Sequence, residues 1–543
     1  MEEGYQMLKK HLTAGSKILL IVDPDVDGFT SSALFYNYLT DNYKNKEGFN
    51  FELSYHIPDG KEHGLDTLLK DLTKNKVADL IICADSSSND YDSHKILKEM
   101  GYDILVLDHH NAPTYSENAV VINNQLSKNY SNKDLSGVGV VYKFFEYFEL
   151  KERQQSQLEE QCDDLLIWNY VDLVALGLIS DMMAMLTLEN RYICDYGLSY
   201  LHNQFFKDLV EKQSYSLGDG PLTQIGVAFY ITPLINALIR VGNSIEKERL
   251  FQAFITPNEL VPSTKRGEKG LTETISTQSV RNCVNAKARQ NREKDKAIEM
   301  LNIQIMDNCL ENNKILILNA DELDIPNTLT GLCAMGVAAQ HKKPVILGRT
   351  SPDGKLKGSM RGREESELKD FQKFLQDSHL IDYCEGHANA AGASLPLGNI
   401  DELNAYANET LKDINFNEGF YEADFVVKGN CSYLPTMIEE LDRGKALYGQ
   451  GCKEPIIIAE DITIDPKTIN IIGKNADTIR FTFNGVTYIK FKATELIDQI
   501  KSYSDKINIT AAGRANVNHW GGRMTPQIQI DEIEIKEISK YDF

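Results

Sequence analysis

The chain has 543 residues, of which 42% are hydrophobic and 25% are charged, and its formal net charge at pH 7 is −22. The length predicts about three or four domains, and the composition is that of a globular protein, so disorder is not the default expectation. The negative charge argues against nucleic-acid binding by bulk electrostatics, although a basic groove or bound metal ions can still present positive potential to phosphate.

Cysteine usage and hydropathy indicate the compartment. The nine cysteines are scattered singly, without a C-x-x-C pair. This pattern argues against a disulfide framework and a zinc ribbon, and it favours a reducing cytoplasm. No apolar stretch approaches the roughly 18 residues of a membrane span, and residues 1–17 lack the pattern of a signal peptide. We therefore expect a cytoplasmic protein without a membrane partner.

The first part of the chain alternates between strand-like and helix-like segments. Apolar runs at 17–22, 78–85 and 102–108 predict buried strands, and the apolar spacing at 30–43 and 91–101 predicts helices. Alternation of this kind is typical of a parallel sheet with helices on both faces. An α/β domain is therefore expected at the N-terminus.

Each of these predicted strands runs directly into an aspartate: Asp23, Asp85 and Asp108. In open α/β sheets, ligands bind at the carboxyl ends of the strands. Polar side chains gathered at that edge are more often functional than those at the opposite edge. These aspartates are therefore the first candidates for a site.

The middle of the chain has a helical pattern. Apolar segments at 170–186 and 226–242 are followed by residues 272–308, which are rich in helix formers and contain no Pro or Gly. We interpret the last segment as one extended helix that leaves the first domain and connects it to the next. A solvated surface helix is the alternative.

The last part of the chain shows two further patterns. Strand patterns at 313–321 and 343–350, a helix pattern at 328–341 and a hairpin pattern at 351–362 predict a second, smaller α/β domain. Beyond about residue 413 the pattern changes to short β runs, and about five strands with turns between them suit a small barrel such as an OB-fold.

The segment DPDVDG at 23–28 begins with the spacing of a calcium-binding EF-hand loop, which needs a glutamate six residues after the glycine. That position is Leu34, and a β-type run precedes the loop, so calcium is excluded. A loop of turn-forming aspartates is the structural alternative. Gly28 is expected to let the backbone turn sharply into the following helix.

Three other positions also have structural alternatives. Asp85 can serve as a helix N-cap. The pair His109 and His110 follows a buried strand and precedes a Pro-containing loop, which is more typical of ligands. Asp181 is a lone carboxylate in an apolar segment, and its burial is costly unless it is paired or bound to metal. A salt bridge to Arg191 is the structural alternative for Asp181.

Together these residues predict a two-metal site. Carboxylates with one or two imidazoles and no cysteine suit Mn²⁺ or Mg²⁺ rather than structural zinc. Two ions about 3.5–4 Å apart need a bridging carboxylate and several terminal ones. The residues that provide this set are Asp25, Asp27, Asp85, His109 and Asp181. The predicted reaction is phosphoester hydrolysis, because such ions activate water and stabilise an in-line displacement.

Four segments occur in the order of the four motifs of the DHH phosphoesterases: DPDVDG, CADSSSND, LDHHNAP and GLISDM. EGHANAAGASLP resembles the Gly-Gly-His-x-x-Ala-Ala-Gly motif of the DHH-associated second domain. Further segments resemble the RecJ branch of single-strand-specific 5′→3′ DNA exonucleases: SGVGVVYKF, LVALGLISDM, ITPLINALIR, KPVILG, LKGSMRG and LYGQGCKEP. The resemblance covers essentially the whole chain.

The resemblance implies an α/β protein with four parts. These are a parallel-sheet DHH catalytic domain at 1–268, a long connecting helix at 269–310, a smaller α/β DHH-associated domain that binds substrate at 311–412, and a C-terminal OB-like β-barrel that binds nucleic acid at 413–543.

Carried over by motif position, the resemblance implies a set of metal ligands: Asp25, Asp27, Asp85, His109 and Asp181. Asp85 would be the bridge between two ions. His110 would face the scissile phosphate, and Asp108 would support the histidine pair or a metal. Together with Asp85 and His109, these two residues form the expected catalytic set. Asp23 is a further candidate ligand, at a position that varies among relatives.

The resemblance also implies residues that hold the nucleotide's phosphates: Arg240, Ser359, Arg361, Gly386, His387 and Gly392. Arginine suits forked contacts to phosphate, and glycine allows close backbone approach with histidine as a donor. The chain departs from the family at Glu385, where the motif has its first glycine, and at Tyr448 and Lys453, where it has Phe and Asn. These departures bear on DNA-end recognition, not on the metal ligands.

The implied function is a 5′→3′ exonuclease of single-stranded DNA that uses two Mn²⁺ or Mg²⁺ ions in DNA repair, recombination or replication. We expect a monomer, with a single-strand-binding protein or a helicase as candidate partners. Two alternatives stay open. One is a DHH phosphodiesterase of oligoribonucleotides or cyclic dinucleotides, whose members generally end after the DHH-associated domain. The other is a non-catalytic RecJ-like replication scaffold, which would be expected to lose metal ligands.

Overall fold

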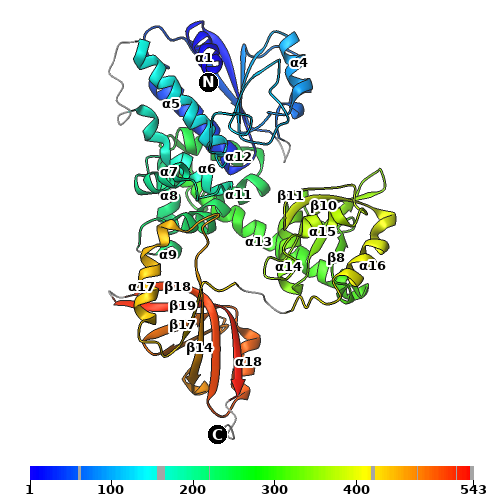
Figure 1. Ribbon diagram of the computed structural model, residues 1–543. Coiled ribbons are helices and arrows are strands. Elements are labelled where there is room, and N and C mark those ends of the chain that lie inside the picture. The colour runs from blue at the N-terminus through cyan, green and yellow to red at the C-terminus, as the bar shows by residue number, and fades with distance from the viewer. Residues whose placement is uncertain are drawn as a thin grey trace. The chain divides into compact units, whose positions relative to one another are not determined.

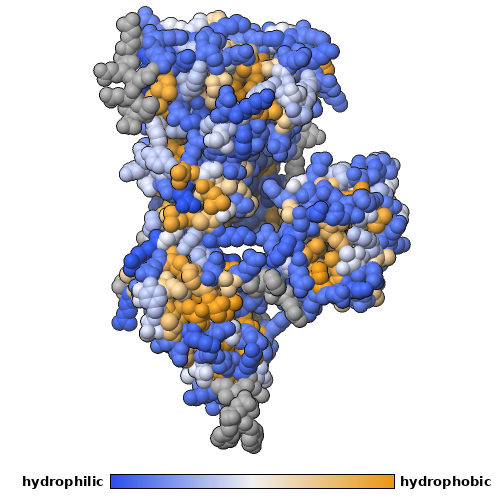
Figure 2. All heavy atoms as spheres, in the orientation of Figure 1, coloured by the Kyte–Doolittle hydropathy of each residue, from blue (hydrophilic) through white to orange (hydrophobic). Residues whose placement is uncertain are grey.

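The computed structural model describes residues 1–58, 63–155, 165–218, 220–417, 422–473, 475–520 and 523–537 (Figure 1). Contacts within the chain define two compact units. The first unit comprises 1–287, 436–454 and 516–525, and the second comprises 288–435, 455–515 and 526–543. Hydrophilic residues cover most of the face shown in Figure 2, with separate apolar patches between them.

The first unit is built on a five-stranded parallel sheet with the order β2-β1-β3-β4-β5. Its strands are β1 (Ser16–Val22), β2 (Phe51–His56), β3 (Leu80–Ala84), β4 (Asp103–Asp108) and β5 (Val120–Asn123). The predicted strands β1, β3 and β4 form its centre, which confirms the expected fold class. The edge strands β2 and β5 were not predicted. No residue of β2 is fully buried, and β5 has four residues, so neither has the long apolar run of a central strand.

Helices cover both faces of this sheet (Figure 1). On one face lie α1 (Glu2–Thr13), α2 (Val26–Asn42) and α5 (Gly137–Gln155), and on the other lie α3 (Leu69–Leu72) and α4 (Tyr91–Glu99). Successive residues of β3 contribute to two separate cores, Leu80 and Ile82 to one and Ile81 and Cys83 to the other. Side chains alternate along a strand, so a sheet covered on both faces needs a continuous apolar run.

Helices form the rest of this unit's N-terminal portion. They are α6 (Val171–Ser180), α7 (Leu188–Ser199), α8 (Gln204–Lys212), α9 (Ser214–Leu217), α10 (Gln224–Gly226), α11 (Thr232–Val241) and α12 (Ser244–Ile255). A π-helical turn at Val227–Ile231 joins α10 to α11. Among the described residues, Gln224–Val241 is long and apolar enough to cross a membrane by length and composition, and 56% of it is buried inside the protein. The apolar segment at 226–242 was predicted, but not with the length of a membrane span, and its burial is typical of a core helix.

The helix α13 (Ile275–Asp307) runs without interruption for 33 residues, which confirms the predicted extended helix. A short antiparallel hairpin of β6 (Leu260–Pro262) and β7 (Thr272–Thr274) precedes it. The boundary between the two units falls within α13, after residue 287. The helix therefore contributes to both units.

The second unit contains a five-stranded sheet with the order β11-β12-β10-β9-β8, in which only the pair of β8 and β9 is parallel. Its strands are β8 (Leu316–Asn319), β9 (Val345–Thr350), β10 (Lys355–Arg361), β11 (Tyr383–His387) and β12 (Ala390–Pro396). The helices of this region are α14 (Thr330–His341), α15 (Phe371–Asp377) and α16 (Ile400–Thr410). The predicted smaller α/β region is therefore confirmed.

The C-terminal sheet has seven strands in the order β13-β14-β18-β19-β17-β16-β15. They are β13 (Phe425–Lys428), β14 (Ile456–Ile464), β15 (Asn470–Ile472), β16 (Thr478–Phe483), β17 (Val486–Lys490), β18 (Ile507–Trp520) and β19 (Arg523–Glu537), accompanied by α17 (Leu434–Arg443) and α18 (Thr494–Ser502). The sequence predicted about five strands. The structure has more, partly because the Asn484-Gly485 turn, with both φ angles positive, divides one predicted run into β16 and β17. The short β15, which pairs with β16, was also missed.

Candidate metal centre

The loop between β1 and α2 brings carboxylates to the carboxyl end of the first sheet. Asp23 follows β1 directly, and Asp25 caps α2 by accepting a hydrogen bond from the Gly28 amide at 2.8 Å. Asp27 lies in the first turn of α2. The structure gives a different reason for Gly28 than the expected sharp turn, because a Cβ there would overlap Asp23. Glycine is needed where the helix passes close to that aspartate.

Asp27 is buried and held by the N-terminus of α5. Its Oδ1 accepts from Ser136 Oγ at 2.9 Å, and its Oδ2 accepts from the Gly137 amide at 2.6 Å. Gly177 of α6 also lies against it, at a point where a Cβ would overlap Oδ1 of Asp27. The segment SGVGVVYKF was predicted only to resemble RecJ proteins, and Ser136 and Gly137 had no predicted role. Their contacts fix the orientation of the Asp27 carboxylate.

Asp85 lies directly after β3 with a φ of 73°, a conformation uncommon outside glycine. Gly137 approaches it so closely that a Cβ would overlap its carboxylate. Asp85 does not cap a helix, because α4 begins at Tyr91 and its N-cap residue is Asp90. Its Oδ1 is buried and has no hydrogen-bond partner. The N-cap alternative is therefore wrong, and the strained, buried carboxylate needs another explanation.

The imidazole of His109 lies among carboxylates from three different parts of the chain. Its Nε2 is 3.2 Å from Oδ1 of Asp85, 3.3 Å from Oδ2 of Asp181 and 4.0 Å from Oδ2 of Asp27. This Nε2 is buried without a hydrogen-bond partner of suitable geometry. Nitrogen and oxygen atoms that converge in this way form the kind of donor set that holds a divalent cation.

Asp181 follows α6 and is the most exposed of these carboxylates. The alternative proposed from the sequence was a salt bridge to Arg191. In the structure the guanidinium of Arg191 instead donates to the carbonyl of Met185 at 3.1 and 2.9 Å. Asp181 therefore faces His109 of the cluster rather than a structural cation.

Asp108 holds the histidine pair. Its Oδ1 accepts from the His109 amide at 2.7 Å and lies 2.8 Å from Nδ1 of His110, and its Oδ2 accepts from the Ser88 amide. Burial alone would raise the pKa of Asp108, but hydrogen bonds, chiefly from His110, bring it below its usual range. The same bond raises the pKa of His110 to about 9. Because both oxygens are engaged, Asp108 fits an orienting role better than metal ligation.

The ionised form of the clustered carboxyl groups is disfavoured, because they are buried close to one another. The pKa of Asp181 rises to about 8, chiefly through burial and then through the charges of Asp27 and Asp25. Burial also raises the pKa of Asp23 to about 6 and raises the pKa values of Asp27 and Asp85. Burial lowers the pKa of His109, which favours the neutral imidazole that binds metals. A divalent cation would supply the missing positive charge.

Three groups of side chains each bring ligand atoms within 4.8 Å of one another: Asp85, His109 and His110; Asp27, His109 and Asp181; Asp23, Asp25 and Asp85. Shared members join these groups into one cluster. Its unpartnered buried atoms, which a cation would satisfy, are Asp23 Oδ1, Asp85 Oδ1 and His109 Nε2. Oxygen and imidazole ligands without cysteine suit Mn²⁺ or Mg²⁺. The cluster can therefore hold metal, and it brings the predicted ligands together.

Two further charged side chains lie at this cluster. Burial lowers the pKa of Arg240 in α11, and the charge of Asp25 opposes that shift, so Arg240 lies within electrostatic range of Asp25. His63, which the sequence analysis did not single out, has Nδ1 2.7 Å from Oδ2 of Asp23, and this bond raises its pKa. His63 lies in a connection between β2 and β3 without periodic pattern, so no local signal pointed to it.

The predicted phosphate-binding residues of the second unit lie on three adjacent strands. One row across β10, β12 and β11 contains Arg361, Ala390 and His387. The row beside it contains Met360, Ala391 and Gly386, and the row after that contains Ser359, Gly392 and Glu385. Gly386 has a φ of 140°, and a Cβ there would lie 2.8 Å from the Ala390 carbonyl, so this position requires glycine. The predicted set is therefore brought together on one part of the sheet.

Two of these side chains reach the first turn of α14. A Cβ at Gly331 would lie 2.5 Å from Nη2 of Arg361 and 3.5 Å from Oγ of Ser359. The N-terminus of a helix presents unpaired amides and the positive end of the helix dipole, both of which attract anions. The arrangement is suited to binding a phosphate group.

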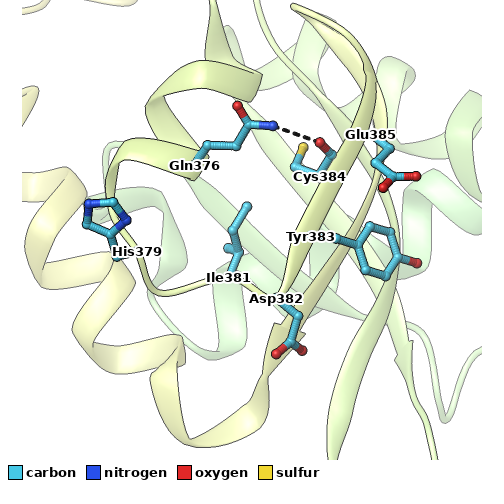
Figure 3. Close-up of a pocket in the computed structure, with 7 residues that line it drawn as sticks. All are labelled: Gln376, His379, Ile381, Asp382, Tyr383, Cys384 and Glu385. Carbon is cyan, nitrogen blue, oxygen red and sulfur yellow. Dashed lines mark hydrogen bonds between the residues drawn. The ribbon is translucent and has the colours of Figure 1, made fainter. Parts of the chain in front are cut away.

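A cavity of about 370 Å³ lies beside β11 (Figure 3), lined by Gln376, His379, Ile381, Asp382, Tyr383, Cys384 and Glu385. Gln376 donates to the Cys384 carbonyl at 3.0 Å and covers part of this edge strand. Tyr383 and Glu385 point away from Gln376 in Figure 3. Because side chains alternate along a strand, they share their face with His387. Glu385 thus adds a carboxylate beside the predicted phosphate contact.

Comparison with known proteins decides the family. The DHH family, N-terminal domain, matches residues 17–178, and the RecJ OB domain matches residues 432–532. The chain is 37% identical to YorK of Bacillus subtilis (strain 168), over 98% of this chain and 90% of that protein. YorK is a prophage-derived protein provisionally assigned as a single-strand DNA-specific exonuclease. The chain belongs to the RecJ family.

More distant RecJ proteins also match along the whole chain. The RecJ single-stranded-DNA-specific exonuclease of Bacillus subtilis is 24% identical over all of this chain and 64% of its own length. Among solved structures, RecJ of Thermus thermophilus in complex with Mn²⁺ matches with a TM-score of 0.71 and 19% identity, over 99% of this chain and 72% of that one. These matches confirm the resemblance to DHH proteins and RecJ, and they confirm the fold.

Proposed function

We propose that this RecJ-family chain is a metal-dependent exonuclease that hydrolyses phosphodiester bonds of single-stranded DNA in the 5′→3′ direction. The observation that carries the proposal is the convergence of unpartnered buried atoms, Asp85 Oδ1 and His109 Nε2, on one site in a chain of this family. The substrate follows the relatives named single-stranded-DNA-specific exonucleases. The polarity follows the resemblance of the motifs.

Five residues would hold two Mn²⁺ or Mg²⁺ ions: Asp25, Asp27, Asp85, His109 and Asp181. Asp85 is the proposed bridge, because its oxygens lie close both to Asp25 and to His109. When bound, such a pair of ions activates water and neutralises charge at the scissile phosphate. A complete set of ligands also argues against a non-catalytic scaffold.

His110 is proposed to contact the scissile phosphate. Asp108 engages its Nδ1, and the imidazole is 57% exposed, so Nε2 remains available to a substrate. An imidazolium donates charge-assisted hydrogen bonds to phosphate oxygens, and Asp108 favours that form. Arg240, whose pKa responds to the charge of Asp25, would add a second cation near the cluster.

The second unit is proposed to hold the strand. Arg361, Ser359 and His387 would bind its phosphates, and Gly386 and Gly392 would let the backbone approach them. The C-terminal sheet, part of which matches the RecJ OB domain, would guide longer strands by stacking and backbone contacts. The proposed division of labour follows the predicted boundaries at residues 268, 310 and 412.

In the cell we propose a cytoplasmic monomer that acts in DNA repair, recombination or replication. A single-strand-binding protein or a helicase is the proposed kind of partner, because either would supply single strands to an exonuclease. These assignments follow from the family and from the chemistry of the substrate.

The central test compares Asp85→Asn with Asp92→Asn, an exposed aspartate on α4 of the same unit. Asp85→Asn should reduce hydrolysis of 5′-phosphorylated single-stranded DNA in Mn²⁺ by about a thousandfold or more, because a neutral amide is a poor bridge between cations. Asp92→Asn should match the wild type. Calorimetric titration of Mn²⁺ should show weakened binding only in Asp85→Asn.

The assay offers single- and double-stranded DNA, RNA and cyclic dinucleotides, labelled at either end, with Mn²⁺ and with Mg²⁺. Preferential loss of a 5′ label from single-stranded DNA supports the proposal. Faster turnover of cyclic dinucleotides or short RNA would replace it with the small-substrate alternative. Full activity of Asp85→Asn would refute the two-metal assignment.

A further inference from the structure

His63 is a second exposed histidine held by a buried carboxylate at this cluster. Its Nδ1 lies 2.7 Å from Asp23, whose side chain is 2% exposed, whereas the imidazole itself is 58% exposed. His110 and Asp108 form a pair of the same design, with the corresponding atoms 2.8 Å apart and exposures of 57% and 0%. In each pair the carboxylate engages Nδ1, so Nε2 is the nitrogen left for another molecule.

The backbone next to His63 is anchored by the loop after β3. Gly64 has a φ of 74°, and a Cβ there would lie 2.5 Å from Oδ2 of Asp90, so the position favours glycine. The following amide, of Leu65, donates to Oδ2 of Asp90 at 2.7 Å and to Oγ of Ser87 at 3.1 Å. The loop that begins with Asp85 therefore also sets the position of the chain at His63.

His63 lies within range of the other charged groups of the cluster. The charges of Asp25 and His110 both act on it. Asp23, its direct partner, belongs to the group that includes Asp25 and Asp85, and its second oxygen, Oδ1, is buried without a hydrogen-bond partner. A histidine whose only task was to neutralise buried Asp23 would have no need of an imidazole open to solvent at the cluster.

We propose that His63 is a further substrate-contacting residue of this site: Asp23 orients the imidazole, and Nε2 contacts a phosphate oxygen of the nucleic acid beside the cluster. The inference rests on the proposed function, because the phosphodiester substrate of that site is the ligand of His63. It assigns Asp23 the role that Asp108 has towards His110. A carboxylate that engages one imidazole nitrogen fixes the direction in which the other points.

Two substitutions of His63 test this inference, because the side-chain amide of each can replace only one of the two imidazole nitrogens. His63→Asn places its amide near the position of Nδ1, where it can still donate to Asp23 but cannot reach the substrate. His63→Gln places its amide near the position of Nε2, where it can still donate to a phosphate. We expect the Asn variant to lose roughly ten- to hundredfold in kcat/KM on single-stranded DNA, as for a lost hydrogen bond to a charged group, and the Gln variant to lose much less.

Controls separate contact from structure. Mn²⁺ affinity and Tm should match the wild type in both variants, and His202→Asn, an exposed histidine of the same unit, should leave kcat/KM unchanged. The reverse ranking, with the Asn variant active and the Gln variant impaired, would show that His63 only supports Asp23 and would overturn the proposal. Unchanged kcat/KM in both variants would overturn it as well.

Failure of the proposed function gives a different result, because the wild type itself would not degrade DNA. The same variants are then ranked by their affinity for inorganic phosphate in Mg²⁺, which is diamagnetic, measured by ³¹P NMR titration. Weaker binding in His63→Asn than in His63→Gln supports the contact by itself. Equal affinity in the wild type and both variants overturns it.

Discussion

The two candidate binding regions of this protein are built in opposite ways. In the metal centre Asp27 and Asp85 are almost fully buried, and backbone amides and glycines hold their carboxylates in place. On the sheet of the second unit, Gly386 and His387 are exposed. Buried charge is costly and needs a counter-ion, whereas exposed charge stays solvated until a ligand arrives. A site for ions must therefore be formed in advance, but a surface for a flexible strand need not be.

The largest difference in effect is expected from a glycine-to-alanine substitution made in each of the two regions. Gly137→Ala should abolish Mn²⁺ binding and reduce activity by about a thousandfold or more, because its Cβ would overlap the Asp85 carboxylate. Gly392→Ala should leave Tm and Mn²⁺ affinity unchanged and raise only the KM for DNA, because its Cβ would meet nothing closer than 3.9 Å. Calorimetric Mn²⁺ titration and steady-state kinetics measure the two effects. Equal losses of Mn²⁺ affinity in both variants would show that the contrast between the regions is wrong.

The pH dependence of stability tests the metal centre's part of this comparison, because its buried carboxyl groups have raised pKa values. A carboxyl group whose pKa is higher in the folded than in the unfolded state binds its proton more tightly when folded. The free energy of unfolding of the metal-free protein should therefore fall as pH rises from about 4 through the raised pKa values of about 6 for Asp23 and about 8 for Asp181.

Mn²⁺ should reverse this loss by taking the place of the protons. Thermal denaturation with Mn²⁺ and with EDTA should show a metal-dependent rise in Tm of roughly 5 °C or more at about pH 8 and a smaller rise at about pH 5. In Asp85→Asn the rise should shrink at both pH values. A rise in Tm independent of pH would contradict the assignment of the raised pKa values to the metal ligands.

Arg361 tests the exposed region directly. Arg361→Ala should raise the KM for single-stranded DNA roughly ten- to hundredfold, the effect of losing a charge-assisted contact to phosphate, with Mn²⁺ affinity unchanged. Arg361→Lys should recover only part of this loss, because lysine keeps the charge but not the fork. Lys373→Ala, an exposed lysine on α15, is the control and should match the wild type. A fall in kcat alone would place Arg361 in the chemical step instead of strand binding.

The smallest effect is expected from Ser136, which donates to Oδ1 of Asp27 at 2.9 Å. Ser136→Ala removes one of the bonds that orient this carboxylate, and a single hydrogen bond of about 1 kcal/mol corresponds to roughly fivefold weaker Mn²⁺ binding. Ser199→Ala, whose hydroxyl donates only to a carbonyl of its own helix, serves as the control. Weakened Mn²⁺ binding in the control, or unchanged Mn²⁺ affinity in Ser136→Ala, would argue against a tuning role for the Ser136 hydroxyl.

Most of the side chains that meet in the candidate metal cluster were singled out from the sequence. Strands that run into Asp23, Asp85 and Asp108, a histidine pair and an isolated aspartate are local features, and their order along the chain is enough to place it in the RecJ family. Hydrophobic runs in the same segments predicted the central strands. Local patterns are visible without a structure because each depends on neighbouring residues alone.

Other features of the fold and the site could not be predicted from the sequence, because they depend on residues far apart in the chain. Edge strand β2 has no long apolar run, and His63 follows no periodic pattern, yet packing brings His63 to Asp23. The N-cap alternative for Asp85 and the salt bridge of Asp181 to Arg191 could be rejected only from contacts.

The sequence by itself therefore determined which chemical groups this protein brings to its site, and in what order along the chain. Only the tertiary structure decided which atoms meet: His109 Nε2 among three carboxylates, Asp27 against Ser136 and Gly137, and both oxygens of Asp108 engaged while Asp85 keeps one free. The reason is physical. Residue types follow from local composition, but distances of a few ångströms between helices and strands follow from how the whole core packs.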